Sequence, residues 1–209
     1  MEKLRESVVA GKVKETTERV NQLLKEGTAP DAMMNDAMIP AMDVVGDLFQ
    51  KGEFYLPEML MAAKAMKAGL EILKPGMVQS GATPAGTVVV GTVRGDMHDI
   101  GKNLLSISLE GAGFKVVDLG IDVPPEAFVE SVKEHQPQVL GLSALLTTTM
   151  IAMREVIEAI QEAGLRDTVK VMIGGAPVTK EYADEIGADF FGPDSTSGKD
   201  FARKAVAQG

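Results

Sequence analysis

Asp96 and His98 are the residues whose types and spacing most directly indicate chemistry in this chain. They stand two positions apart on a segment that directly follows the apolar run 87–93 and reads Gly95-Asp96-Met97-His98-Asp99-Ile100-Gly101. At that spacing the carboxylate can reach one imidazole nitrogen while the other points outward as a ligand, an arrangement common for metal-binding histidines. Gly95 and Gly101 let backbone approach a bulky group closely. The loop therefore predicts a ligand-binding histidine.

A polar turn between a strand and a helix gives a plainer account of the same segment. A histidine there can simply cap the following helix, and Asp99 and Asn103 suit capping or loop roles better than ligand roles. The second histidine, His135, falls at the end of a predicted helix, where we expect it to be solvated. The Asp96–His98 pair therefore needs support from elsewhere in the chain.

Two further segments carry small or hydroxylated residues where predicted strands end. They contribute Ser143, Thr147 and Thr149 from one segment, and Gly174, Gly175 and Ala176 from the other. The paired glycines leave a slot for a flat group, and Ser143 could hydrogen-bond a nitrogen inside it. A dinucleotide site is not expected, because the glycines of the first loop lack the spacing of a phosphate-binding G-x-G-x-x-G motif.

Composition narrows the class of protein. The chain has 209 residues, 45% hydrophobic and 24% charged, which is ordinary for a globular protein with one large or two small domains. A formal net charge of −9 argues against nucleic acid or an anionic membrane as the main partner. Without cysteine, disulfides, iron–sulfur clusters and thiolate zinc sites are excluded. No apolar signal core or membrane span is apparent, so we expect a cytoplasmic protein.

Residues 1–78 are predicted to be helical. Apolar residues recur at helical spacing in three stretches, which end at Gly27, at Gly52 and at Pro75-Gly76. A short helix before Gly11 would complete a four-helix bundle. The helical spacing of most methionines in this part predicts that they form its core.

Residues 79–86 have the composition of a linker, and the chain changes character after them. Short β-branched runs then alternate with amphipathic segments. The runs cover 87–93, 115–119, 138–143, 169–173 and 188–191, and helices are expected near 102–112, 125–135, 149–163, 180–186 and 198–207. This alternation predicts a flavodoxin-like (Rossmann-like), doubly wound, five-stranded parallel sheet over residues 87–209. Ligands bind such sheets beyond the carboxyl ends of the strands, where the Asp96–His98 loop lies.

The three strand-end motifs, in this order, resemble the cobalamin-binding domain family, whose pattern is D-x-H-x-x-G, then S-x-L, then G-G. The matching residues are Asp96, His98, Gly101, Ser143, Leu145, Gly174 and Gly175. The helical half resembles the cap domain that precedes this module in methionine synthase and in methyl-carrying corrinoid proteins. That resemblance rests on the segment 52–58 and on Ala62, Ala63, Met66 and Lys67. Together the two resemblances cover nearly the whole chain.

The resemblance implies that cobalamin binds with its dimethylbenzimidazole tail detached from cobalt and buried in the sheet domain. His98 would then be the lower axial ligand of cobalt, Asp96 would accept a hydrogen bond from the other ring nitrogen, and Thr149 would continue this relay toward solvent. The relay would assist the cofactor as it cycles between methylcobalamin and cob(I)alamin. The further cofactor contacts that the resemblance implies are Gly95, Met97, Asp99, Ile100, Gly101, Ser143, Leu145, Thr147, Gly174, Gly175, Ala176, Gly192 and Asp194, with Tyr55 and Leu56 of the cap over the upper corrin face.

The function implied by the resemblance is that of a corrinoid methyl carrier, a component of one-carbon metabolism that does not turn over alone. Its partners would be a substrate-specific methyltransferase, a second methyltransferase acting on tetrahydrofolate or a thiol cofactor, and a reductive activator protein. Methylamines, methanol, methoxylated aromatics and glycine betaine all remain open as methyl donors.

Two rival functions also use cobalamin. One is the small subunit of an adenosylcobalamin-dependent mutase, against which the cap-like residues 1–78 weigh. The other is a cobalamin-dependent regulator, against which the lack of a basic recognition helix weighs. A flavodoxin-like domain with a helical extension and no cofactor would leave the three motifs unexplained.

Overall fold

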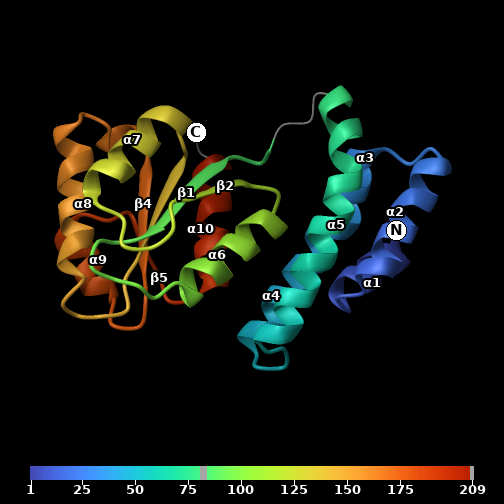
Figure 1. Cartoon of the computed structure of the whole chain (residues 1–209), viewed down its shortest axis with the longest axis horizontal. Coiled ribbons are helices and arrows are strands. Elements are labelled where there is room, and N and C mark those ends of the chain that lie inside the picture. The colour runs from blue at the N-terminus through green and yellow to red at the C-terminus, as the bar shows by residue number, and fades with distance from the viewer. Residues whose placement is uncertain (81–83, 208–209) are drawn as a thin grey trace. The chain divides into compact units, whose positions relative to one another are not determined.

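The structure, a computed structural model, describes residues 1–80 and 84–207 (Figure 1). It contains two compact units, a helical unit built on residues 1–84 and a sheet unit built on the residues after them. Part of the predicted linker, residues 81–83, lies outside the described residues. Among the described helices, none combines the length and the apolar character needed to cross a membrane.

The helical unit is the predicted bundle. Its α-helices are α1 (Glu2–Val9), α2 (Val13–Lys25), α3 (Pro30–Met33), α4 (Ile39–Gln50) and α5 (Leu56–Ser80). Helix α2 packs along α5, and α1 contacts α2, α4 and α5. Their shared core contains fully buried residues spaced three or four apart, among them Met38, Ala41 and Val45 in one stretch and Ala62 and Ala65 in another.

A π-helical turn, Met34–Met38, joins α3 to α4 where the sequence pattern predicts an unbroken α-helix. Pro40 explains the difference. Proline has no N–H, and in a regular helix its ring would clash with the carbonyl group of Asp36 four residues earlier. The Ile39 N–H donates instead to the carbonyl oxygen of Met34, five residues earlier, which widens the turn.

Helix α5 also differs from its predicted extent. Its end was expected at Pro75-Gly76, but the helix continues through Pro75 to Ser80 and takes up the first two residues of the predicted linker. A proline in a helix interior costs about 3 kcal/mol, so packing has to compensate. Gly76 allows a close approach of α3, because a Cβ atom there would lie 2.7 Å from Cγ of Pro30. Tertiary contact therefore overrides the local stop signal.

The sheet unit contains the predicted five-stranded parallel sheet. Its strands are β1 (Thr87–Thr92), β2 (Lys115–Asp118), β3 (Val139–Ser143), β4 (Lys170–Gly174) and β5 (Phe190–Gly192), in the order β2-β1-β3-β4-β5. The chain leaves β1 toward one edge and returns from β2 to β3 on the other side of β1. The direction of winding thus reverses between β1 and β3, where doubly wound sheets bind ligands.

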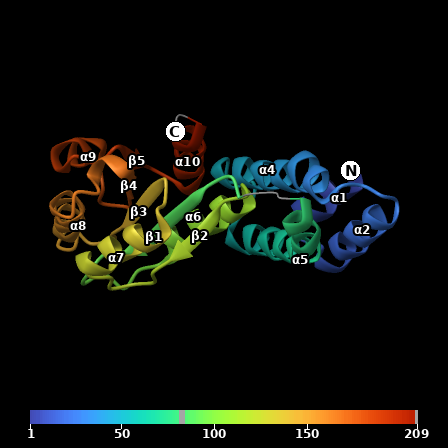
Figure 2. The same ribbon diagram turned by 90° about the horizontal axis from the view of Figure 1, so that it is seen from above.

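Helices cover both faces of this sheet. They are α6 (Ile100–Gly111), α7 (Pro125–His135), α8 (Ile151–Glu162), α9 (Lys180–Ile186) and α10 (Ser195–Ala207). Helices α7, α8 and α9 lie on one face, and α6 and α10 lie on the other (Figures 1 and 2). The first face holds a continuous apolar core around Phe128, Leu140, Met153 and Ile173. This core fixes the strands whose carboxyl ends carry the predicted site.

Candidate functional site

Asp96 is the centre of the site, fully buried just beyond β1. Its Oδ1 accepts the backbone N–H of His98 at 3.0 Å and lies 2.8 Å from Nδ1 of the same residue. Its Oδ2 accepts the N–H of Leu145 at 2.7 Å and the hydroxyl of Thr149 at 2.6 Å, with a longer bond of 3.3 Å from the N–H of Leu146. One carboxylate thereby joins the loop after β1 to the loop after β3.

These hydrogen bonds set the charge of Asp96 and the tautomer of His98. Burial alone would raise the pKa of Asp96. The hydrogen bonds from Thr149, from the backbone of His98 and Leu145, and from the His98 ring together outweigh burial and hold the pKa well below its usual range. An ionised carboxylate can only accept, so we assign the imidazole proton to Nδ1. Nε2 is then left with a lone pair for a metal.

His98 combines a fixed backbone with an accessible ring. The Thr92 hydroxyl donates to its carbonyl oxygen at 3.0 Å, and Asp96 holds its N–H and its Nδ1. The side chain is nevertheless 51% exposed. One imidazole supplies a single coordination bond, which suits a metal that brings its remaining ligands with it.

A third loop, after β2, is tied to the same place by Asp122. Its Oδ1 accepts the N–H of Gly95 at 2.7 Å, and its own N–H donates to the carbonyl oxygen of Asp96 at 3.0 Å. Asp122 has a φ of 52°, a left-handed conformation that aspartate tolerates better than most residues. Neither Asp122 nor Thr92 was among the predicted site residues. A hydroxyl residue that ends an apolar strand was the one available signal for the latter.

Exposed apolar side chains stand on the segments that meet at Asp96 and His98. They come from the three loops that Asp96 and Asp122 connect, and from the first residues of α6 and α8. They are Met97, Ile100, Ile121, Leu145, Leu146 and Ile151, with exposed fractions from 38% for Ile121 to 65% for Ile100. Large apolar residues gathered at one edge of a folded unit mark a binding surface. The rim fits a broad, largely apolar ligand that presents a metal to the central imidazole.

A row of small residues crosses the carboxyl ends of four strands. In register from β1 to β5 these are Thr92, Ser143, Gly174 and Gly192. Their strand neighbours Leu142 and Ile173 belong to the core under α7, α8 and α9, so Ser143 points to the face that α6 and α10 cover. The structure thus brings Ser143 and Gly174 together as predicted, on a face where side chains are small.

Packing requires a glycine at position 175, which the sequence did not reveal. Gly175 adopts a φ of 133°, and a Cβ atom there would lie 1.8 Å from the carbonyl oxygen of Ala144. Any larger residue would push the loops after β3 and β4 apart. Its predicted contact with a cofactor tail therefore stands beside a packing role.

Other predicted contacts lie farther from Asp96 in the chain or have other partners. Thr147 and Ala176 are exposed on their loops, and Asp194 caps α10 by accepting the N–H of Ser197 at 2.7 Å. Tyr55 and Leu56, 67% and 37% exposed, stand at the start of α5 in the helical unit. Their predicted place over the upper corrin face remains a prediction.

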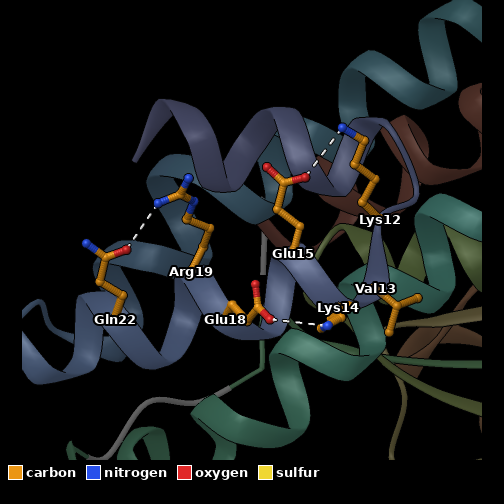
Figure 3. Close-up of a pocket in the computed structure, with 7 residues that line it drawn as sticks. All are labelled: Lys12, Val13, Lys14, Glu15, Glu18, Arg19 and Gln22. Carbon is orange, nitrogen blue, oxygen red and sulfur yellow. Dashed lines mark hydrogen bonds and ion pairs between the residues drawn. The ribbon is translucent and has the colours of Figure 1, made fainter.

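The hollow in Figure 3 is of a different kind. It lies along α2 and is lined by Lys12, Val13, Lys14, Glu15, Glu18, Arg19 and Gln22. Its polar side chains contact one another along the helix: Lys12 pairs with Glu15 at 3.4 Å, and Arg19 donates a hydrogen bond to Oε1 of Gln22 at 3.1 Å. Such pairs are typical of a solvated helix face and contribute little to stability.

Thr149→Val should lower the stability of the apoprotein by about 1–2 kcal/mol, because valine keeps the shape of threonine but removes a donor from the buried Asp96 carboxylate. Thr149→Ser is the matched control, since it keeps the hydroxyl and should unfold close to the wild type. Urea unfolding at pH 7 measures both free energies. Equal stability of Thr149→Val and the wild type would contradict the importance of this hydrogen bond.

The fold and the site define a Rossmann-like domain that presents one histidine to a large ligand at its topological switch point. Comparisons with known proteins agree with this class. A family described as a B12 binding domain matches residues 86–200, and a second family with the same description matches residues 1–74.

Named relatives support the same assignment. The chain is 46% identical over 181 residues to trimethylamine corrinoid protein 1 of Methanosarcina acetivorans, which covers 86% of this chain and 84% of the relative. It is 46% identical over 179 residues to dimethylamine corrinoid protein 1 of the same organism, covering 85% and 84%. A chain of the methanol:cobalamin methyltransferase complex of Methanosarcina barkeri superposes with a TM-score of 0.88 at 32% identity, covering 99% of this chain and 79% of that one.

The protein belongs to the family of cobalamin-binding corrinoid proteins of methyltransferase systems. The family and the cofactor expected from the three strand-end motifs are therefore confirmed.

Proposed function

We propose that this protein carries a methyl group on the cobalt of cobalamin, bound with His98 in place of the dimethylbenzimidazole base. The observation that carries the proposal is the Asp96–His98 pair inside its apolar rim. A buried carboxylate fixes Nδ1, the ring is half exposed, and the segments tied to Asp96 carry exposed apolar side chains. A planar corrin ring has the shape and polarity that this surface requires.

The chain's own residues would divide the binding of the cofactor between them. His98 would ligate cobalt through Nε2, with Asp96 and Thr149 behind it as a hydrogen-bonded relay. Ser143 and Gly174 would receive the detached tail on the face under α6 and α10. The tail would thereby be kept away from the metal.

Cobalt in cobalamin supplies a centre that accepts a methyl group and gives it up again. The strength of a bond from His98 to cobalt would matter for this exchange, and the partners of the imidazole would set that strength. Asp96 raises the basicity of the imidazole while its Nδ1–H bond is intact. Thr149 steadies the carboxylate by donating to the oxygen that His98 does not use. In the helical unit, Tyr55 and Leu56 would shield the upper face from water.

We propose that the methyl donor is a methylated amine, delivered by a substrate-specific methyltransferase. The support is the similarity to corrinoid proteins named for trimethylamine and dimethylamine, at 46% identity in both cases. A second methyltransferase acting on tetrahydrofolate or a thiol would take the methyl group. A reductive activator would restore cobalt after accidental oxidation.

The test is to load the apoprotein with hydroxocobalamin, reduce it, and mix it with methyltransferases for trimethylamine, dimethylamine, monomethylamine or methanol and the matching donor. Rapid appearance of the methylcobalamin absorption spectrum with one of the amine pairs is expected. Methylation only by the methanol pair would overturn the proposed donor. Tight binding of adenosylcobalamin, with no methylation by any pair, would favour the mutase alternative instead.

A further inference from the structure

Lys102, in the first turn of α6, is a buried charge that the proposed chemistry does not use. Its side chain is only 3% exposed, and Nζ lies 2.5 Å from Oδ2 of Asp118 and 2.8 Å from Oδ1 of Asn103. Removing an ammonium group from water carries a large free-energy cost that pairing only partly offsets. An apolar side chain of similar length would fill this space without that cost, so stability alone does not account for a lysine here.

The partners of Lys102 connect both ends of the His98 segment. On one side, Asn103 Nδ2 donates to Oδ2 of Asp99 at 3.0 Å, and Asp99 directly follows His98. The contacts through Asn103 fix Asp99, which immediately follows the predicted cobalt ligand.

On the other side, Asp118 Oδ1 accepts the N–H of Gly120 at 2.8 Å. The carbonyl oxygen of Gly120 accepts the N–H of Thr92 at 3.0 Å, and the Thr92 hydroxyl donates to the carbonyl oxygen of His98 at 3.0 Å. The contacts therefore close a ring. Its members in order are His98, Asp99, Asn103, Lys102, Asp118, Gly120 and Thr92.

We propose that Lys102 and Asp118 are positioning residues, whose ion pair closes this ring and holds the backbone of His98 at the angle from which its imidazole meets the cofactor. Asp96 holds His98 through its ring Nδ1 and its backbone N–H, whereas the ring of contacts that Lys102 and Asp118 close holds the carbonyl oxygen of His98 and the residue after it. The two constraints use different atoms of His98. The effect on the backbone can be measured without a cofactor, whereas the effect on cobalt rests on the proposed function.

The first test uses the apoprotein. Lys102→Met should speed amide hydrogen exchange at residues 98–105 several-fold, with little change in the strands β3 and β4. Lys170→Met is the matched control, because Lys170 lies at the opposite end of the sheet and pairs with Asp189 at 3.4 Å while 59% exposed. Exchange at residues 98–105 that is no faster in Lys102→Met than in Lys170→Met would overturn the proposal.

The second test measures the consequence for the cofactor. Lys102→Met and Asp118→Asn should each weaken cobalamin binding on the order of tenfold, as loss of outer-shell partners of metal ligands does. Each should also diminish the histidine-nitrogen splitting in the electron paramagnetic resonance spectrum of the cob(II) form. Lys102→Arg keeps the charge and should restore most of both. Combining the two substitutions should add little to either alone, because they break one contact.

The outcomes separate this proposal from the proposed function. Faster exchange in Lys102→Met together with unchanged affinity and splitting would overturn the role toward cobalt. If the wild-type protein binds no cobalamin while Lys102→Met still speeds amide exchange at residues 98–105, the proposed function is overturned and the backbone role is supported. If Lys102→Met does not fold, Asp118→Asn gives the same comparison, since the Asp118 side chain is 37% exposed and asparagine keeps its shape.

Discussion

His98→Ala should abolish the histidine-nitrogen splitting of the cob(II) signal while some cobalamin binding remains. The ring is the one imidazole within the apolar rim, and its Nε2 is the atom that Asp96 leaves available for a metal. The rim and the small-residue face under α6 and α10 remain intact in the variant, so the cofactor keeps most of its contact surface. We expect affinity to fall at least about tenfold, because even outer-shell partners of metal ligands contribute 10- to 100-fold.

His135→Ala is the matched control for this experiment. His135 lies at the end of α7 with its ring near Glu134, and its loss should change neither the splitting nor the affinity. A spectrum of His98→Ala that still shows nitrogen splitting would contradict the assignment of the ligand. Loss of splitting in both variants would point to a general disturbance of the fold rather than to coordination.

Much of the sheet unit could be predicted because its signals are local. Short β-branched runs alternate with amphipathic segments. The first three predicted runs contain the observed strands, and the last two each end one residue before the strand does. The Asp96–His98 contact was also predictable, since the partners stand two positions apart and the loop position follows from the strand before them. Here local spacing and global fold agree.

The contacts that were not predicted join segments that lie far apart in the chain, or they involve backbone atoms. Lys102 and Asp118 are 16 positions apart, and nothing in either residue type predicts that they meet. The N–H groups of Leu145 and Leu146 bind Asp96 from about 50 positions away, yet every residue except proline has such a group. The π-helical turn and the continuation of α5 through Pro75 likewise depend on packing and hydrogen bonding that a single-residue propensity does not describe.

Asp96→Asn should remove cobalt coordination even though His98 is still present. An amide group has one accepting and one donating end. Its NH₂ would face two backbone N–H donors, those of Leu145 and Leu146, on one side and only that of His98 on the other, so we expect it to turn toward His98. Nδ1 of His98 would then become the acceptor and the imidazole proton would move to Nε2, the coordinating atom. We expect cobalamin to bind more weakly, with the cob(II) splitting diminished and the reduction potential changed.

The same substitution should lower the stability of the apoprotein in a pH-dependent way. At pH 7 we expect a loss of about 3 kcal/mol, because a buried, multiply hydrogen-bonded carboxylate is replaced by a group that cannot satisfy all of its donors. Hydrogen bonds lower the pKa of Asp96 in the folded state, so its stabilising effect is complete above the unfolded-state pKa of about 3.9 and fades as the pH falls below it. The gap between wild type and Asp96→Asn in urea unfolding should therefore be constant from pH 7 to 5 and narrow toward pH 3.

Asp167→Asn serves as the control for this pH series, since Asp167 is exposed in a short 3₁₀ turn far along the chain from the site. Its unfolding should follow the wild type at every pH. A gap for Asp96→Asn that stays constant down to pH 3 would mean that folding does not lower the pKa of Asp96. The hydrogen bonds from Thr149, Leu145 and His98 would then not stabilise the charged carboxylate over its protonated form, and the explanation given for the lowered pKa would fail.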